Sequence, residues 1–163
     1  MPTGVLSLTG KVERMFLGRY QHTLDGKGRL TVPARYRQLL AEGGYILQGL
    51  DQNLMVMRVD AFEALAAQVN QTNLTEDKAR DLRRVFFSTA EYFEPDKSGR
   101  ILVPQSLRSE HGLEGELTLI GMGSHFEIWP ADLWQAKESK MRSNAGNAGY
   151  FSEHDLRPTF DGS

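Results

Sequence analysis

The chain has 163 residues, 40% of them hydrophobic, a formal net charge of −2 and no cysteine. Without cysteine there are no disulfides, thiolate zinc sites or cysteine nucleophiles, which is typical of proteins in a reducing cytosol. No run approaches the roughly 18 apolar residues that a membrane span needs. We therefore expect a soluble, cytoplasmic protein without a membrane partner.

Positive charge is concentrated in two stretches of the sequence. Residues 11–40 contain seven Lys and Arg against two acidic residues, a net charge of +5, and residues 96–108 have a net charge of +2. The rest of the chain therefore carries a net charge of −9. A local basic face matters more for binding a polyanion than the overall net charge does.

The first predicted elements are two strands joined by a tight turn. Residues 18–24 place β-branched, aromatic and polar residues in near alternation, the turn reads Asp25-Gly26-Lys27-Gly28, and residues 29–32 form the return strand. Gly26 and Gly28 can both take positive φ in such a turn. The Asp25 carboxylate can accept hydrogen bonds from the backbone of its own turn.

A short helix and two more strands complete this unit. Pro33 suits the first position of a helix over 34–40, which Gly43 and Gly44 end. Residues 45–47 and 54–57 have the composition of two further strands.

Two helices are predicted between this unit and the next. Asp60 and Glu63 form a capping-box pattern at the start of the first helix, and Thr75 precedes the second. The apolar stripe of the first helix is Phe62, Leu65, Ala66 and Val69. The later turns of the second helix carry Arg80, Arg83 and Arg84, which we interpret as a solvated face.

The second half of the chain repeats the first at a constant offset of 71 residues. The segment from Leu24 to Pro33 returns from Pro95 to Pro104, with Asp, Gly, Arg, Val and Pro identical at the matching positions. The same order of elements follows, ending in a strand hairpin and a last helix after Trp134. Each unit is thus β-turn-β-α-β-β. A unit of about 45 residues is too small for a stable core of its own, so we expect the halves to share one.

The predicted class is α+β, mainly β with helices. The boundaries that we expect are an N-terminal extension at 1–14, a first repeat at 18–61, linking helices at 62–89, a second repeat at 90–133, and a C-terminal helix with a flexible tail at 134–163.

Arg29 and Arg100 are the leading candidates for a binding site, because each follows a glycine-bearing turn. A guanidinium can grip phosphate oxygens or read guanine edges in the major groove, which a two-stranded ribbon is narrow enough to enter. The structural alternative is an ion pair from Asp25 and Asp96 to these arginines, which contributes only ~0–1 kcal/mol if exposed. The two roles can also combine, with each Asp shaping the turn that presents its Arg.

Further basic residues surround these arginines. Candidate DNA contacts, which position the protein without reading sequence, are Lys27, Lys97, Arg19, Arg35, Arg37 and Arg108. For Arg35, Arg37 and Arg108 a solvated helix face is the competing interpretation. Residues expected to shape the turns are Asp25, Gly28, Asp96 and Gly99.

Enzymatic chemistry is not indicated. The four histidines have neither i, i+4 pairing nor nearby cysteine, so we expect no metal, and no Gly-rich phosphate loop opens a helix, so we expect no cofactor. Two equivalent Asp residues are also a feature of aspartic proteases. That chemistry needs two carboxyls that share one proton, whereas an Arg beside Asp25 and another beside Asp96 would keep both ionised.

The doubled Asp-x-x-x-Arg motif, each copy followed by Val-Pro, closely resembles the signature of the MraZ family. Met15-Phe16-Leu17-Gly18 before the first copy and Phe126-Glu127-Ile128-Trp129 after the second resemble the same family. The resemblance implies a tandem SpoVT/AbrB-like fold, a pseudo-twofold swapped-hairpin β-barrel. It places the motif arginines on Arg29 and Arg100. Residues 1–14 precede the usual start of such chains, as an extension, a tag remnant or an early start codon.

The function that the resemblance implies is transcriptional regulation. MraZ-like proteins form homo-oligomeric rings that bind repeated promoter elements in double-stranded DNA, ahead of a bacterial division and cell-wall gene cluster. We therefore expect a non-enzymatic regulator at the nucleoid. The alternative is an oligomeric scaffold or protein-interaction module with incidental DNA binding, for which an exposed Trp134, the arginine-bearing helix and the tail would matter most.

Overall fold

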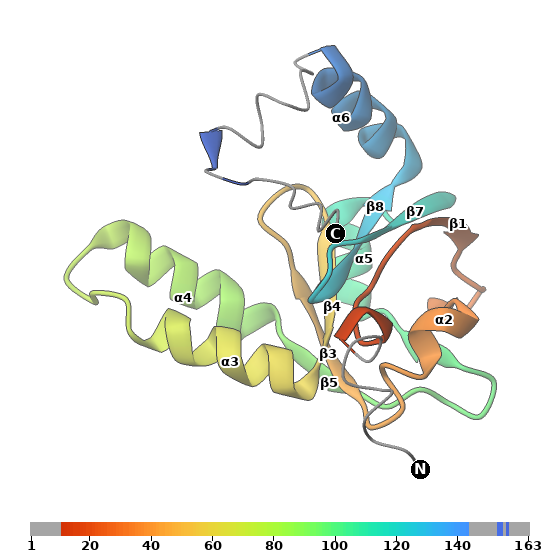
Figure 1. Cartoon of the computed structure of the whole chain (residues 1–163), viewed down its shortest axis with the longest axis horizontal. Coiled ribbons are helices and arrows are strands. Elements are labelled where there is room, and N and C mark those ends of the chain that lie inside the picture. The colour runs from red at the N-terminus through yellow and green to blue at the C-terminus, as the bar shows by residue number, and fades with distance from the viewer. Residues whose placement is uncertain (1–10, 144–152, 155, 157–163) are drawn as a thin grey trace, which may run out of the picture. The chain divides into compact units, whose positions relative to one another are not determined.

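The computed structural model describes residues 11–143, 153, 154 and 156. From Arg19 to Ser143, eight strands and the five helices α2 to α6 follow one another (Figure 1). The first repeat contains β1 (Arg19–Thr23), β2 (Arg29–Thr31), α2 (Ala34–Arg37), β3 (Gly44–Gln48) and β4 (Leu54–Arg58). The linking helices are α3 (Val59–Asn70) and α4 (Asp77–Thr89). The second repeat contains β5 (Glu91–Phe93), β6 (Arg100–Leu102), α5 (Gln105–His111), β7 (Glu116–Gly121) and β8 (His125–Pro130).

The chain divides into two compact units at Ala131. All of α6 (Ala131–Ser143) except its first residue lies in the second unit, and this helix begins before Trp134 rather than after it. Most of the predicted tail lies outside the described residues. The α+β class with a mostly antiparallel sheet is confirmed within the first unit.

The six-stranded sheet exchanges strands between the repeats. Its order is β1-β7-β8-β4-β3-β5, and every neighbouring pair is antiparallel. The outer strand β1 of the first repeat therefore lies beside the β7–β8 hairpin of the second, and β5 of the second lies beside the β3–β4 hairpin of the first. In the centre β4 pairs with β8, where Leu54 lies opposite Ile128 and Met57 opposite His125. The offset of 71 relates these two pairs to each other, because Leu54 is equivalent to His125 and Met57 is equivalent to Ile128.

A separate two-stranded ribbon joins β2 to β6. Leu30 lies opposite Ile101, and these two residues are themselves related by the offset of 71. The expected pairing of β1 with β2 is wrong, because β1 pairs with β7 and β2 with β6. Sequence adjacency favours a local hairpin, whereas burying the apolar side of each strand requires a partner from the other repeat. The strands form two sheets, and a closed barrel stays a prediction.

One apolar core is shared by the repeats, as expected. Leu30 and Ile101 are buried, and so are Val32, Val103 and Leu107, with Tyr36, Phe16 and Phe126 at its centre. The Tyr36 ring stacks on Phe126 at 4.9 Å between centroids and meets Phe16 edge-on at 5.1 Å. The Tyr36 hydroxyl donates a 2.8 Å hydrogen bond to the Leu17 carbonyl oxygen. The Met-Phe-Leu-Gly segment is thereby tied into the core.

Helices α3 and α4 pack on the opposite side of β3 and β4. Residues such as Leu47, Met55 and Met57 face this second cluster, together with Phe62 and Phe86 from the helices. Strands β3 and β4 are consequently buried on both faces, which explains their continuous apolar sequences.

The predicted caps of these helices are wrong. The N-cap of α3 is Arg58 and that of α4 is Glu76, and neither makes a capping side-chain bond. Asp60 lies inside the first turn and accepts a hydrogen bond from Arg58. Arg83 is not merely solvated, because its guanidinium donates to the carbonyl oxygens of Asn70 and Thr72 and so holds the connection between the helices.

Replacing Tyr36 by phenylalanine removes the buried hydroxyl, and the Leu17 carbonyl oxygen then loses the hydrogen bond that this hydroxyl donates. We expect Tyr36→Phe to lower the free energy of unfolding by about 1 kcal/mol, measured by urea denaturation. Tyr20→Phe is the matched control, because the Tyr20 ring also contacts Tyr36 while its hydroxyl makes no hydrogen bond within the described residues. Equal stability of Tyr36→Phe and wild type would contradict the role of the hydroxyl.

Stability at alkaline pH tests the same group. Burial raises the pKa of Tyr36 to about 12, whereas the unfolded chain has a tyrosine pKa of about 10. Below pH 10 the contribution of this shift is fully present, and it is lost as the pH rises from 10 through 12, because the unfolded chain releases the proton first. We expect wild type to lose more stability than Tyr36→Phe over this interval, in parallel denaturation series.

Candidate nucleic-acid interface

The two turns that precede β2 and β6 have the same hydrogen-bonded structure. Asp25 Oδ1 accepts the backbone N–H groups of Lys27 and Arg29, both at 2.9 Å, and Asp25 Oδ2 accepts Arg29 Nε–H at 2.8 Å. In the second repeat, Asp96 Oδ1 accepts the backbone N–H groups of Ser98 and Arg100, and Asp96 Oδ2 accepts Arg100 Nε–H, at the same three distances. The prediction that each Asp caps its own turn is confirmed.

These hydrogen bonds hold both carboxylates in the ionised form. The pKa of Asp25 is lowered, first by the backbone hydrogen bond from Arg29 and then also by that residue's side chain. The pKa of Asp96 is lowered in the same way by Arg100. The ion pair that formed the structural alternative is therefore present in both copies.

Each ion pair leaves part of its arginine available to a ligand. Asp25 takes Nε–H of Arg29, while the Nη end, which carries four of the five guanidinium N–H groups, makes no hydrogen bond among the described residues. Arg100 is bound to Asp96 in the same way. Their side chains are 29% and 32% exposed. The carboxylate fixes the guanidinium plane, and the fork that recognises phosphate or guanine remains open.

The ribbon places Arg29 and Arg100 on one face. Side chains alternate along a strand, and Leu30 and Ile101 point into the core. Arg29, opposite Leu102, and Arg100, opposite Thr31, therefore lie on the outer face. They occupy diagonal positions, which are about 7–8 Å apart in an antiparallel pair.

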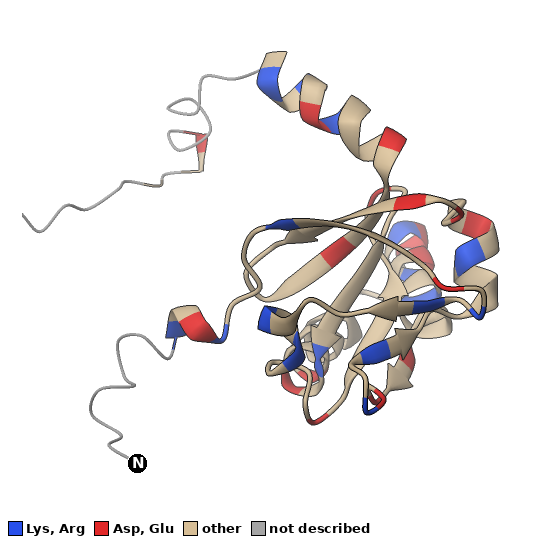
Figure 2. Cartoon of the chain, turned by 90° about the vertical axis from the view of Figure 1, so that its right-hand side faces the viewer, with Lys and Arg blue, Asp and Glu red and all other residues tan. Residues whose placement is uncertain are grey.

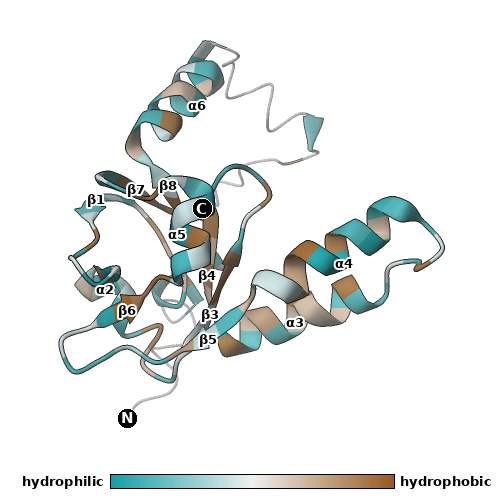
Figure 3. Cartoon of the chain, turned by 180° about the vertical axis from the view of Figure 1, so that it is seen from behind, coloured by the Kyte–Doolittle hydropathy of each residue, from teal (hydrophilic) through white to brown (hydrophobic). Residues whose placement is uncertain are grey.

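Thr31 and Leu102 complete this outer face and were missed as site residues. Thr31 is exposed, and Leu102 is 55% exposed although it is apolar. Figure 3 shows hydrophobic residues (brown) along β6. The signal that could have found both residues is the strand alternation around a buried Leu30 and Ile101. We name the four residues Arg29, Thr31, Arg100 and Leu102 the ribbon face.

Arg37 and Arg108 each lie over the turn of the other repeat. Arg108 Nε–H donates to the Val103 carbonyl oxygen at 2.9 Å, and a Cβ added at Gly28 would overlap the Arg108 guanidinium. Arg37 donates to the Val32 carbonyl oxygen at 2.8 Å, and a Cβ added at Gly99 would overlap it. Two cross-repeat hydrogen bonds of 2.9 Å, from Val32 N–H to the Gly99 carbonyl oxygen and from Val103 N–H to that of Gly28, reinforce this packing.

Glycine is needed at these two turn positions for two reasons. Gly28 has φ +78° and Gly99 φ +75°, in the left-handed region, and both lie against a guanidinium. Gly26 was also expected to take positive φ, but it does not. Lys97 occupies the equivalent place in the second turn, which shows that this position suits a residue with a side chain.

The other predicted contacts lie around the ribbon or apart from it. Lys27 and Lys97 are exposed in the turns, and Arg35 is exposed on α2. Arg19 begins β1, at the edge of the six-stranded sheet. Figure 2 shows Lys and Arg together with Asp and Glu on the short strands and neighbouring loops. The surface is therefore a set of cations beside acidic groups rather than a purely basic patch.

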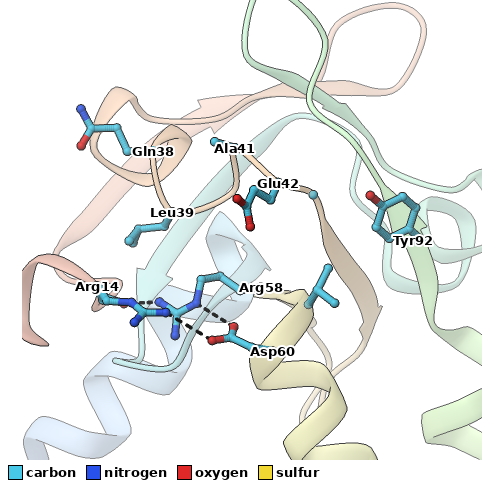
Figure 4. A pocket seen from close by; sticks show the side chains of 10 residues that line it. Arg14, Gln38, Leu39, Ala41, Glu42, Arg58, Asp60 and Tyr92 are labelled. Carbon is cyan, nitrogen blue, oxygen red and sulfur yellow. Dashed lines mark hydrogen bonds and ion pairs between the residues drawn. The ribbon is translucent and has the colours of Figure 1, made fainter.

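A pocket of about 640 Å³ lies outside this set (Figure 4). Arg14 and Arg58 point toward Asp60 on one side of it, with Asp60 Oδ1 3.0 Å from Arg58 Nε and Oδ2 3.3 Å from Arg14 Nη2. Arg58 also donates to the Arg14 carbonyl oxygen at 2.6 Å. The hydrogen bond from Arg58 is the main cause that lowers the pKa of Asp60. Asp60 thus bridges the two arginines and ties the segment before β1 to α3.

The described part of the chain shows neither a metal site nor a membrane-spanning helix. No group of three His, Cys, Asp or Glu side chains there is placed to hold a metal ion. No helix among those residues has the length and apolar character needed to cross a bilayer.

Replacing Gly28 by alanine tests the packing of Arg108. An alanine in left-handed backbone costs about 1–2 kcal/mol, and at Gly28 the new methyl group must also displace Arg108 from Val103. Gly123→Ala is the matched control, because φ is +83° there and the added Cβ meets open space. We expect Gly28→Ala to destabilise more in urea denaturation, and the excess to vanish when Arg108→Ala is also present. An excess that persists in the Arg108→Ala background would contradict this packing.

Comparison with known proteins agrees with the repeated architecture. A family model described as "MraZ protein, putative antitoxin-like" matches twice, at residues 15–85 and 86–150. A relative from Herpetosiphon aurantiacus, named transcriptional regulator MraZ, is 41% identical over 86% of this chain and 96% of its own length. Relatives of the same name from Roseiflexus castenholzii and Kocuria rhizophila are 44% and 46% identical, over 80% and 74% of this chain and 92% and 85% of their own. The chain therefore belongs to the MraZ family.

Proposed function

We propose that this protein is a transcriptional regulator that binds double-stranded DNA through the ribbon face and the two turns beside it. The observation that carries the proposal is the pair of arginines, Arg29 and Arg100, each fixed at Nε by its own Asp and open at the Nη end. The name transcriptional regulator, carried by relatives of 41–46% identity, supports the same function.

The proposed contacts divide into two groups. Arg29 and Arg100 read base edges in the major groove, which is about 12 Å wide and admits a two-stranded ribbon. Lys27, Lys97, Arg19 and Arg35 contact phosphates and set the orientation of the protein. Arg37 and Arg108 hold the opposite turns in place, and their remaining N–H groups contact the backbone of the DNA.

The finer features of the proposal concern assembly and target. One ribbon face offers few base contacts, so we infer that copies of the chain assemble into a ring whose ribbons engage repeated promoter elements together. The two sheets close around the shared core as a swapped-hairpin barrel in each copy. The target is the promoter of a bacterial division and cell-wall gene cluster, and the site of action is the nucleoid in the cytoplasm.

Removing the two arginines tests the proposal. We expect Arg29→Ala with Arg100→Ala to weaken binding to the DNA upstream of the coding sequence by at least about 30-fold, since each bidentate base contact is worth about 1–3 kcal/mol. Fluorescence anisotropy at fixed salt measures the affinity. Circular dichroism and size-exclusion chromatography establish that fold and assembly are retained.

Arg84→Ala is the matched control, because Arg84 is an exposed arginine paired with Asp81 on α4. It should bind the same DNA as wild type does. Lys27→Ala should weaken binding to all sequences alike and lower the salt dependence by about one counterion. Wild-type affinity of the double arginine variant would contradict the assignment of the site.

One observation favours a second candidate function, an oligomeric scaffold. Leu82, Val85 and Phe87 of α4 are between 37% and 40% exposed. Trp134, expected to be exposed for this role, is only 8% exposed. Equal affinity of the wild type for its upstream DNA and for a scrambled fragment of the same length would favour the scaffold over the regulator.

A further inference from the structure

The two halves of the proposed DNA-binding surface have the same backbone conformation. The turns make the same hydrogen bonds at the same lengths, and their equivalent positions have the same burial: the Asp is exposed, the Gly buried, and the Arg intermediate. The ribbon pairs Leu30 with its own equivalent, Ile101. A surface with this pseudo-twofold relation would present the same groups in both directions if its side chains were also equivalent.

The turn side chains are not equivalent. Each turn has a single lysine, but it is the third residue of the first turn, Lys27, and the second residue of the second turn, Lys97. The matching positions are held by Ser98 and Gly26, and all four residues are exposed. Each turn carries the same net charge of +1, from one Asp, one Lys and one Arg. The difference is therefore one of position and not of charge.

The outer face of the ribbon is unequal as well. Thr31 lies opposite Arg100, whereas its equivalent Leu102 lies opposite Arg29. One arginine thus has a hydroxyl as its neighbour and the other an apolar side chain that is more than half exposed. A hydroxyl can bond to either donors or acceptors on base edges, while an apolar group suits the methyl group of thymine.

We propose that these differences give the protein one fixed direction on DNA. This proposal rests on the proposed function. It assigns the choice of direction to Thr31 and Leu102, which meet base edges, while the unequal turn residues Gly26, Lys27, Lys97 and Ser98 place the phosphate contacts differently in the two halves. Arg29 and Arg100 supply contacts that are alike in both directions. The unequal residues then decide which half of an asymmetric DNA element each turn meets.

The cysteine-free sequence allows a direct measurement of direction. Ser109 on α5 lines a small pocket with Asp25 and Gly28 of the first turn, and Gln38, its equivalent by the offset of 71, follows Arg37, which lies over Gly99 of the second turn. Ser109→Cys or Gln38→Cys introduces a unique thiol, to which an iron chelate is attached. On a fragment with one upstream element, hydroxyl-radical cleavage then reports where each turn lies.

We expect the two probes to cleave on opposite sides of the element, with a preference of at least about fivefold for one side, since one good base contact discriminates by about 1–3 kcal/mol. A variant that exchanges the unequal residues keeps composition and net charge. Its substitutions are Gly26→Lys, Lys27→Ser, Lys97→Gly, Ser98→Lys, Thr31→Leu and Leu102→Thr. In this variant the two sides of cleavage should be reversed.

A second variant guards against misfolding of the first. With only Gly26→Lys, Lys27→Ser and Thr31→Leu, the unequal turn and ribbon positions of both halves carry the side chains of the second repeat, and each probe should cleave both sides equally. Equal cleavage by the wild type would overturn the fixed direction. An unchanged preference in either variant would overturn its assignment to these residues, and neither result would affect DNA binding itself. If the wild type did not bind the DNA fragment at all, the proposed function itself would instead be refuted.

Discussion

Each repeat of this chain depends on the other for its structure. Strands β1 and β5 pair with the hairpins of the opposite repeat, and β2 pairs with β6 across the centre. A repeat by itself would leave Leu30 or Ile101 in water and its outer strand without a ladder partner. Removing apolar surface from water contributes about 25 cal/mol for each Å². The exchanged arrangement is therefore the stable one, because it buries this surface in the shared core.

The same exchange positions the candidate site. Gly28 is held beneath Arg108, and Gly99 beneath Arg37, so each turn is packed by a helix of the other repeat. Within the turn, the Asp carboxylate uses one oxygen for two backbone N–H groups and the other for Arg Nε–H. The orientation of Arg29 is thus set before any ligand arrives, and less conformational entropy is lost on binding.

Local chemistry was predictable from the residues. The Asp-capped turns, the positive φ of Gly28, and the strands 45–47 and 54–57 follow from turn preferences and apolar runs, which act over a few residues. Helix ends were less predictable, because Asp60 lies inside the first turn of α3, where it accepts the Ala61 N–H and pairs with Arg58 and Arg14, and the N-cap is Arg58. Thr75 likewise bonds to Asn73 instead of capping α4. In both cases a neighbour two residues away, Arg58 or Asn73, competes with a capping interaction that is worth about 1 kcal/mol.

By itself the sequence determined that the chain contains two equivalent units, where their turns lie, and that an Asp can cap each turn. These properties depend on contacts within five residues. Only the tertiary structure decided that β2 pairs with β6, that Arg29 and Arg100 share one face with Thr31 and Leu102, and that Arg37 and Arg108 cross to the opposite turns. Such contacts join residues that are 62 to 80 positions apart, and they exist because neither repeat can bury its apolar face alone.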